Sequence, residues 1–281
     1  MVNFNGEILP KSSTFLNHEN RGLRYGDALF ETIRVVNQKI YFWEDHYLRL
    51  MASMRMLRME IPMNFTMEFL EEQILKTIGA NKWEQQALRI RITVFRDNGG
   101  VYLPEKNTIS YTIEAAQLEN VFYTFSQASY EVELFKDYYV SPDILSTLKT
   151  NNKIINVLGS IYASENKYDN CLLLNNAKQV VEALNGNVFL VSGKTIKTPP
   201  KNNGCLNGIL RKKLIEIVVK LDDYELLEAP ISPFELQKAD EMFITNAIVG
   251  IQSVTKYRKK EYGSEIAKDL IGKLNALARL S

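Results

Sequence analysis

The fold class is decided by the stretch ALRIRITVF at residues 87–95. Its apolar residues alternate with arginine and threonine, which is the pattern of a strand with one buried face. The letters DNGG at residues 97–100 then turn the chain, and residues 108–115 predict a second strand. Two strands joined by a turn form an antiparallel hairpin. This arrangement favours a mixed α+β fold over regular βαβ repeats.

Helices and further strands are predicted on both sides of this hairpin. Helical spacing of apolar residues predicts helices over residues 45–57, 67–78, 152–166, 207–220 and 264–280. The third should bury Ile154, Ile155, Leu158, Ile161 and Tyr162, and Asn207 is the predicted N-cap of the fourth. Short apolar segments predict strands at residues 39–43, 172–174, 180–181, 187–191 and 241–245.

The periodic pattern pauses near residues 117–120, which predicts a domain boundary. We therefore expect an N-terminal α/β domain over residues 1–116, a linker over residues 117–122 and a C-terminal domain over residues 123–281. A chain of 281 residues is long enough for two such domains, each with its own core.

The composition excludes several classes of function. A formal net charge of +1 gives no electrostatic reason to bind nucleic acid or an anionic membrane. The apolar runs are too short to span a bilayer and the first residues lack a signal-peptide pattern, so we expect a cytoplasmic protein. Only two cysteines and two histidines are present, which argues against disulfides and metal sites. Any chemistry should rest on lysine, carboxylates, hydroxyls or a bound cofactor.

Three segments carry candidate chemistry. Glu182 lies between two predicted apolar strands, where a buried charge is costly unless a cation faces it. Gly208 opens a predicted helix whose free N–H groups and dipole favour an anion. Thr245 and Asn246 follow a predicted strand, where ligand groups are often presented. Lys149, just ahead of a helix, reads from its own residue type as an ordinary solvated lysine.

These segments together resemble the class IV aminotransferase family, the fold-type IV pyridoxal-phosphate enzymes. The family includes branched-chain aminotransferases, D-amino-acid aminotransferases and 4-amino-4-deoxychorismate lyase. The matching segments are residues 21–32, 46–50, 148–149, 182–189, 208–211 and 245–247, and their order and spacing cover nearly the whole chain. The resemblance implies a two-domain architecture like that of D-amino-acid aminotransferase, and a homodimer.

The resemblance also implies a role for each matching residue. Lys149 would hold pyridoxal 5'-phosphate as an internal aldimine and move the proton of the substrate. Glu182 would keep the pyridine nitrogen protonated, so that the ring accepts electrons from the carbanion. Arg49 would bind the phosphate. The remaining cofactor-binding positions are Asn187, Gly208, Ile209, Leu210, Thr245, Asn246 and Ala247.

The substrate side of the expected site is less sharply defined. Thr32 is expected to be a catalytic residue that hydrogen-bonds near the reacting carbon, and the predicted substrate-binding residues are Tyr25, Phe30, Arg96 and Tyr102. Read as residues alone, Tyr25 and Phe30 fit a domain core as well as a pocket wall. Arg96, Arg24 and Arg34 are all candidates for the group that anchors the substrate's carboxylate.

The chain departs from each subgroup of the family. Branched-chain enzymes usually carry tyrosine where this chain has Ile154, and a Thr-Gly-Thr-Ala-like segment where it has residues 245–247. Lyases typically place arginine where this chain has Val101. The missing arginine favours amino-group transfer between an amino acid and a 2-oxo acid. The alternatives are the lyase, which eliminates pyruvate to give p-aminobenzoate, and a non-catalytic cofactor-binding homologue. Against the last, both Lys149 and Glu182 are present.

Overall fold

The computed structural model describes all residues from Met1 to Ser281. The chain divides into two compact units: the first contains residues 1–121, Lys149–Asn152 and Ser281, and the second contains residues 122–148 and 153–280. Lys149–Asn152 is grouped with the first unit, although we expected it in the C-terminal domain. The reason is main-chain pairing, since the Phe30 N–H donates to Lys149 O and the Asn151 N–H donates to Ala28 O, both at 2.9 Å.

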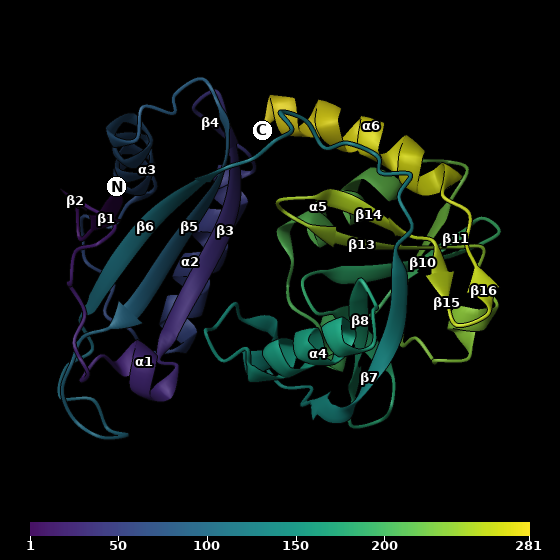
Figure 1. Ribbon diagram of the computed structural model, residues 1–281, viewed down its shortest axis with the longest axis horizontal. Coiled ribbons are helices and arrows are strands. Elements are labelled where there is room, and N and C mark those ends of the chain that lie inside the picture. The colour runs from purple at the N-terminus through teal and green to yellow at the C-terminus, as the bar shows by residue number, and fades with distance from the viewer. The chain divides into compact units, whose positions relative to one another are not determined.

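The first unit contains one antiparallel sheet and three helices (Figure 1). Its strands are β1 (Val2–Phe4), β2 (Glu7–Leu9), β3 (Ala28–Val36), β4 (Lys39–Ile40), β5 (Ala87–Arg96) and β6 (Ile109–Gln117). Its helices are α1 (Arg21–Tyr25), α2 (Trp43–Met56) and α3 (Met67–Ala80). The strand order is β2-β1-β6-β5-β3-β4. The predicted hairpin is confirmed as β5 and β6, which pair along their whole length.

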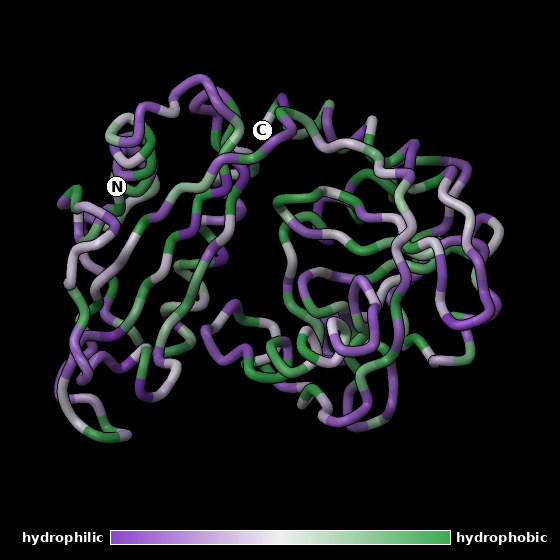
Figure 2. The backbone as a smooth tube through the Cα atoms, viewed as in Figure 1, coloured by the Kyte–Doolittle hydropathy of each residue, from purple (hydrophilic) through white to green (hydrophobic).

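The two faces of this sheet differ in chemistry. Ile90, Ile92 and Val94 of β5 are fully buried on the face that packs against α2 and α3. Arg89 and Arg91 point to the other face because successive side chains of a strand alternate. Figure 2 shows this alternation as hydrophobic and hydrophilic segments that follow each other along the strands.

The predicted strand at residues 39–43 is wrong in its second half. Only Lys39–Ile40 forms a strand, and Trp43 already begins α2. Phe42 between them adopts the left-handed conformation with φ 55°, which a strand cannot contain. An apolar run of this length is compatible with either structure, and here the helix begins inside it.

The second unit contains two sheets and three α-helices. One sheet, in the order β12-β11-β10-β13-β14, contains β10 (Asn187–Ser192), β11 (Thr195–Thr198), β12 (Glu225–Glu228), β13 (Glu241–Asn246) and β14 (Gly250–Val254). The other, in the order β16-β15-β7-β8-β9, contains β7 (Glu131–Val140), β8 (Asn170–Asn175), β9 (Val180–Ala183), β15 (Lys256–Tyr257) and β16 (Lys260–Glu261). The α-helices are α4 (Ile154–Glu165), α5 (Ile209–Val218) and α6 (Glu265–Leu280), and short 3-10 turns lie at Leu145–Thr147, Lys201–Asn203 and Glu235–Gln237.

The two sheets of this unit share one core. Leu134 and Leu172 of one sheet pack with Val188, Met242 and Ile244 of the other, and all five are nearly inaccessible to solvent. Helix α4 packs on β7 and β8, while α5 and α6 pack on the sheet that contains β13. The mixture of helices with largely antiparallel sheets confirms the predicted α+β class.

Two predicted details of the helices are corrected. Ile154 and Ile161 of α4 are 65% and 48% exposed, so only part of the predicted apolar face is buried. The helix is apolar around most of its circumference, and periodicity alone then cannot select the buried side. Gly208, and not Asn207, is the N-cap of α5. No helix in the chain has the length and apolarity that a membrane span requires.

Candidate functional site

The backbone of Lys149 pairs with the start of strand β3 in the N-terminal unit. Its carbonyl accepts the Phe30 N–H, and Thr150 forms a bridge to Leu29, so the segment continues the sheet beside the start of β3. Its Nζ lies 4.4 Å from the centroid of the Phe30 ring. The backbone of this lysine is thus positioned by main-chain hydrogen bonds, which is a rigid support for a reactive amine.

Two predicted substrate-side residues lie near this lysine. Phe30 contacts its Nζ, and Thr32 follows two residues later on the same face of β3. Both are half-buried, which leaves part of each side chain open to a ligand. The structure therefore brings Lys149, Phe30 and Thr32 to the same part of one sheet face. Tyr25 and Tyr102 contact each other instead, with ring centroids 5.8 Å apart.

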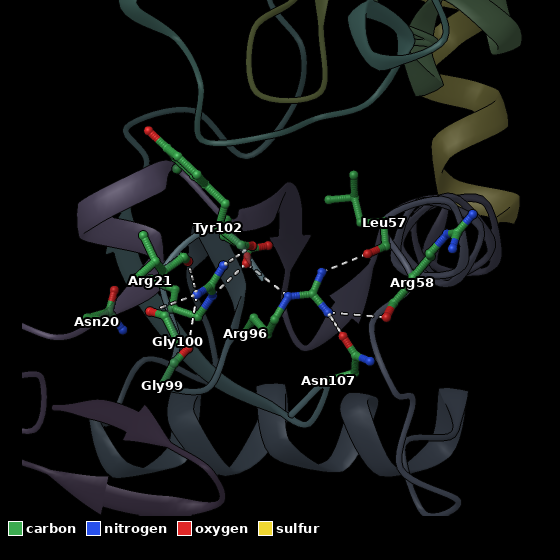
Figure 3. Close-up of polar contacts among 12 residues, drawn as sticks. Asn20, Arg21, Leu57, Arg58, Arg96, Gly99, Gly100, Tyr102 and Asn107 are labelled. Atoms are coloured by element: carbon green, nitrogen blue, oxygen red, sulfur yellow. Dashed lines mark hydrogen bonds and ion pairs between the residues drawn. The ribbon is translucent and has the colours of Figure 1, made fainter. Parts of the chain in front are cut away.

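The guanidinium of Arg96, a predicted substrate-binding residue, is bonded on every side within the chain. All three guanidinium nitrogens bond within the chain: Nε donates to Asp27 at 2.9 Å, Nη1 to Asn107 at 2.6 Å and Nη2 to the carbonyl of Leu57 at 2.7 Å. Figure 3 shows this side chain beside Arg21, whose guanidinium donates to the backbone carbonyls of residues 99–102. The Arg96 side chain is 6% exposed, and its hydrogen bonds shape the loop after β5.

The two other arginine candidates are also engaged. Arg24 Nε donates to the carbonyl of His18 at 2.9 Å, and a carbonyl of Asn120 accepts from Arg34. The arginines that the sequence suggested as carboxylate anchors thus form hydrogen bonds with loop and backbone groups.

A buried charged cluster lies on the opposite face of β3. Glu31 accepts hydrogen bonds from Arg49 Nε at 2.7 Å, from Arg49 Nη2 at 2.5 Å and from His46 Nδ1 at 2.7 Å. A carboxylate only accepts, so Nδ1 carries the proton. Burial lowers the pKa of His46 against the raising effect of Glu31, and its Nε2 has no partner. The sequence predicted Arg49 as a phosphate ligand but not that Glu31 orients it.

This cluster should contribute strongly to stability. Burial alone would raise the pKa of Glu31, but the charge of Arg49 and the hydrogen bonds of His46 and Arg49 lower it to about 2. We expect Glu31→Gln to lower the free energy of unfolding by about 3–5 kcal/mol, because Arg49 keeps a buried charge that nothing balances. Urea denaturation measures this difference. The exposed Glu72→Gln serves as control and should change it by less than about 0.5 kcal/mol.

The same pair of proteins gives a pH test. A carboxyl whose pKa is lowered on folding stabilises the fold above its unfolded pKa, and this stabilisation is lost as the pH falls towards the folded value. The difference between wild type and Glu31→Gln should therefore be constant above about pH 4.5 and shrink between pH 4.5 and 2. A difference that stays constant to pH 2 would show that Glu31 does not titrate in this cluster.

The second unit gathers most of the predicted cofactor residues around Leu206. Glu182 on β9 is 9% exposed, and its Oε2 accepts the Leu206 N–H at 2.9 Å. Asn187, the first residue of β10, donates from Nδ2 to the Leu206 carbonyl at 2.9 Å. Gly208 follows as the N-cap of α5, and a Cβ there would lie 2.0 Å from Asn187 Oδ1. Glycine is thus needed for this close approach.

The start of α5 and the end of β13 have the groups that a phosphate requires. No side chain caps the first turn of α5, which contains Ile209 and Leu210. Thr245 pairs with Asn187 across the sheet, is 1% exposed, and its hydroxyl has no hydrogen-bond partner. An uncapped helix N-terminus beside an orphaned buried hydroxyl fits a phosphate group, since both lack the acceptor that a phosphate supplies.

Asn246 and Ala247 have local roles in the turn after β13. Asn246 Oδ1 accepts the N–H groups of Ile248 and Val249, at 3.0 and 2.9 Å, and the Ala247 carbonyl accepts the Tyr123 hydroxyl at 3.0 Å. Any contact of Asn246 and Ala247 with the cofactor would therefore come from their other backbone groups. No group of three or more His, Cys, Asp and Glu side chains is arranged to hold a metal ion.

Comparison with known proteins gives one family and one fold. The model of the family described as Amino-transferase class IV matches residues 28–257. A putative branched-chain-amino-acid aminotransferase of Methanocaldococcus jannaschii is 28% identical over 256 residues, which is 90% of this chain and 86% of that protein. A D-alanine aminotransferase of Listeria monocytogenes is 27% identical over 260 residues, 89% and 85% of the two chains.

A solved structure extends the comparison to the fold. The branched-chain amino acid aminotransferase of Thermobaculum terrenum, in its PLP form, superposes with a TM-score of 0.85. It is 21% identical and the match covers 100% of this chain and 94% of that one. The predicted fold-type IV architecture is confirmed by this likeness over nearly the full length.

Proposed function

Because the chain belongs to the class IV aminotransferase family, we propose that it transfers an amino group between an amino acid and a 2-oxo acid with pyridoxal phosphate. Members of the family and structural neighbours bind this cofactor. Two relatives that are 27–28% identical carry aminotransferase names. The observation that carries the proposal is the fixed position of Lys149, whose backbone is paired with β3 and whose amine contacts Phe30.

Each proposed role follows from the chemistry of the side chain. Pyridoxal phosphate, when bound, supplies an electron sink that stabilises negative charge at the substrate's α-carbon. Lys149 is the amine that holds the cofactor and then moves the α-proton. Glu182 is the acid that keeps the ring nitrogen protonated, since a nearby carboxylate favours the charged form of a base. Thr32 contacts the substrate near the reacting carbon.

The phosphate is proposed to bind where the chain has unsatisfied donors. The N–H groups of Ile209 and Leu210 and the hydroxyl of Thr245 supply hydrogen bonds, and Gly208 allows the phosphate to approach them. Arg49 of the first unit keeps the phosphate-binding role that the family resemblance implies as a proposal, and Glu31 orients its guanidinium through two hydrogen bonds. Asn187 supports this part by fixing the backbone of Leu206.

The test separates amino transfer from the related elimination. The purified protein is incubated with single amino acids and with pyruvate or 2-oxoglutarate, and separately with aminodeoxychorismate. Formation of a new amino acid and a new 2-oxo acid supports the proposal. Release of pyruvate together with p-aminobenzoate supports the lyase instead. A yellow cofactor-loaded protein that gives neither set of products would refute both enzymatic functions.

A further inference from the structure

Tyr123 connects helix α6 to the turn that follows β13, within the second unit. Its N–H donates to Asn275 Oδ1 at 3.0 Å, and its carbonyl accepts from Asn275 Nδ2 at 2.8 Å. One turn further along α6, the guanidinium carbon of Arg279 lies 4.4 Å from the centroid of the Phe122 ring. Figure 1 shows this part of the chain running along α6. The helix therefore fixes the backbone from which the Tyr123 side chain extends.

The side chain of Tyr123 packs against the turn after β13. It is 2% exposed, and its hydroxyl donates to the Ala247 carbonyl at 3.0 Å. A Cβ on Gly250 would lie 2.6 Å from Tyr123 Cδ1, so the ring lies directly on the backbone at the start of β14. Gly250 has φ +81°, which glycine adopts without strain. The hydroxyl and the ring thus hold the two ends of the turn.

Two hydrogen-bond donors at this turn have no partner within the chain. The Asn246 side chain accepts the N–H groups of Ile248 and Val249, but the N–H of Ala247 is not bonded. The hydroxyl of Thr245, at the end of β13, is buried and also has no partner. The turn itself is partly exposed, and exposed loops are the more mobile parts of a fold. The two donors are therefore useful to a ligand only if the turn is held in place.

We propose that Tyr123 is a positioning residue of the phosphate site. This inference rests on the proposed aminotransferase function. The hydroxyl fixes the carbonyl of Ala247, and the turn then presents the Ala247 N–H and the Thr245 hydroxyl before a phosphate arrives. A phosphate binds more tightly to donors that are already ordered, because binding does not have to order them. Tyr123 acts through the turn, since its hydroxyl is used by the Ala247 carbonyl.

Two ligands that differ only in the phosphate separate this role from a general structural one. The full-length protein, freed of cofactor, is titrated with pyridoxal phosphate and with pyridoxal, and the two dissociation constants are compared. Tyr123→Phe removes the hydroxyl and keeps the ring against Gly250. It should weaken the binding of pyridoxal phosphate by about 3- to 10-fold, the usual effect of one hydrogen bond, and leave the binding of pyridoxal unchanged.

Tyr257→Phe is the matched control. Tyr257 lies in the same unit and is completely buried, and its hydroxyl has no hydrogen-bond partner. Removing this hydroxyl breaks no contact, so both dissociation constants should stay at their wild-type values. Circular dichroism of the two variants checks that each is folded at the temperature of the titration.

The outcomes distinguish the inference from the function on which it rests. Equal weakening of both ligands by Tyr123→Phe would show a general loss of structure, and unchanged binding of both would show that the turn does not need the hydroxyl. Either result overturns the inference and leaves the proposed function standing. A wild type that binds pyridoxal as tightly as pyridoxal phosphate would refute the phosphate site and the inference together. Amino transfer by the wild type tests the proposed function separately.

Discussion

Lys149→Ala should lose the visible absorbance of the bound cofactor and all measurable amino transfer, while the fold stays intact. The fold is preserved because Lys149 is tied to β3 through its backbone carbonyl, which alanine retains. The amine, in contrast, has no substitute at this place, since the other cation on the Phe30 ring is Arg91, which cannot lose its proton. Absorbance spectra, product analysis and circular dichroism of the purified variant measure the three effects.

The matched control is Lys153→Ala, four residues further along and at the N-cap of α4. It should keep the absorbance band and the activity. In the wild type, borohydride reduction and digestion should place the mass of the cofactor on the peptide that contains Lys149. A Lys149→Ala protein that retains the band, or a label on another peptide, would mean that a different lysine holds the cofactor.

Most of the secondary structure was predictable because local patterns determine it. Strand β5 and helices α3 and α6 lie within two residues of their predicted bounds, since each has one polar and one apolar face. The errors fall where this contrast is missing. Ile161 of the largely apolar α4 is exposed, and Phe42 takes a left-handed conformation that no periodicity indicates.

The arginines show what one sequence cannot supply. Arg91 and Arg96 lie on the same strand, and because they are five residues apart their side chains face opposite sides of the sheet. The sequence does not show their partners, because only the folded chain places Arg91 opposite Thr32 and Arg96 beside Asp27. Lys149 is also an unremarkable loop lysine by its own residue type. Its candidacy came from family resemblance, and its pairing with β3 came from the structure.

Glu182→Gln should keep the cofactor bound and lower the rate of amino transfer by about 10²- to 10³-fold, the usual cost of removing one preorganised electrostatic group. The glutamine oxygen can still accept the Leu206 N–H, so the contact that positions this side chain survives the change. What disappears is the negative charge that keeps the ring nitrogen protonated. The variant thus separates the effect of the negative charge of Glu182 from the effect of its shape and hydrogen bond.

Stopped-flow spectra of Glu182→Gln report whether the cofactor is bound, and steady-state rates report the loss of amino transfer. Glu225→Gln is the control, because Glu225 lies in the same unit on β12, is exposed and makes no side-chain hydrogen bond. It should leave both the spectrum and the rate unchanged. If Glu182→Gln turns over at a near-normal rate, the carboxylate is a structural acceptor for Leu206 alone, and the electron-sink role must belong to another group.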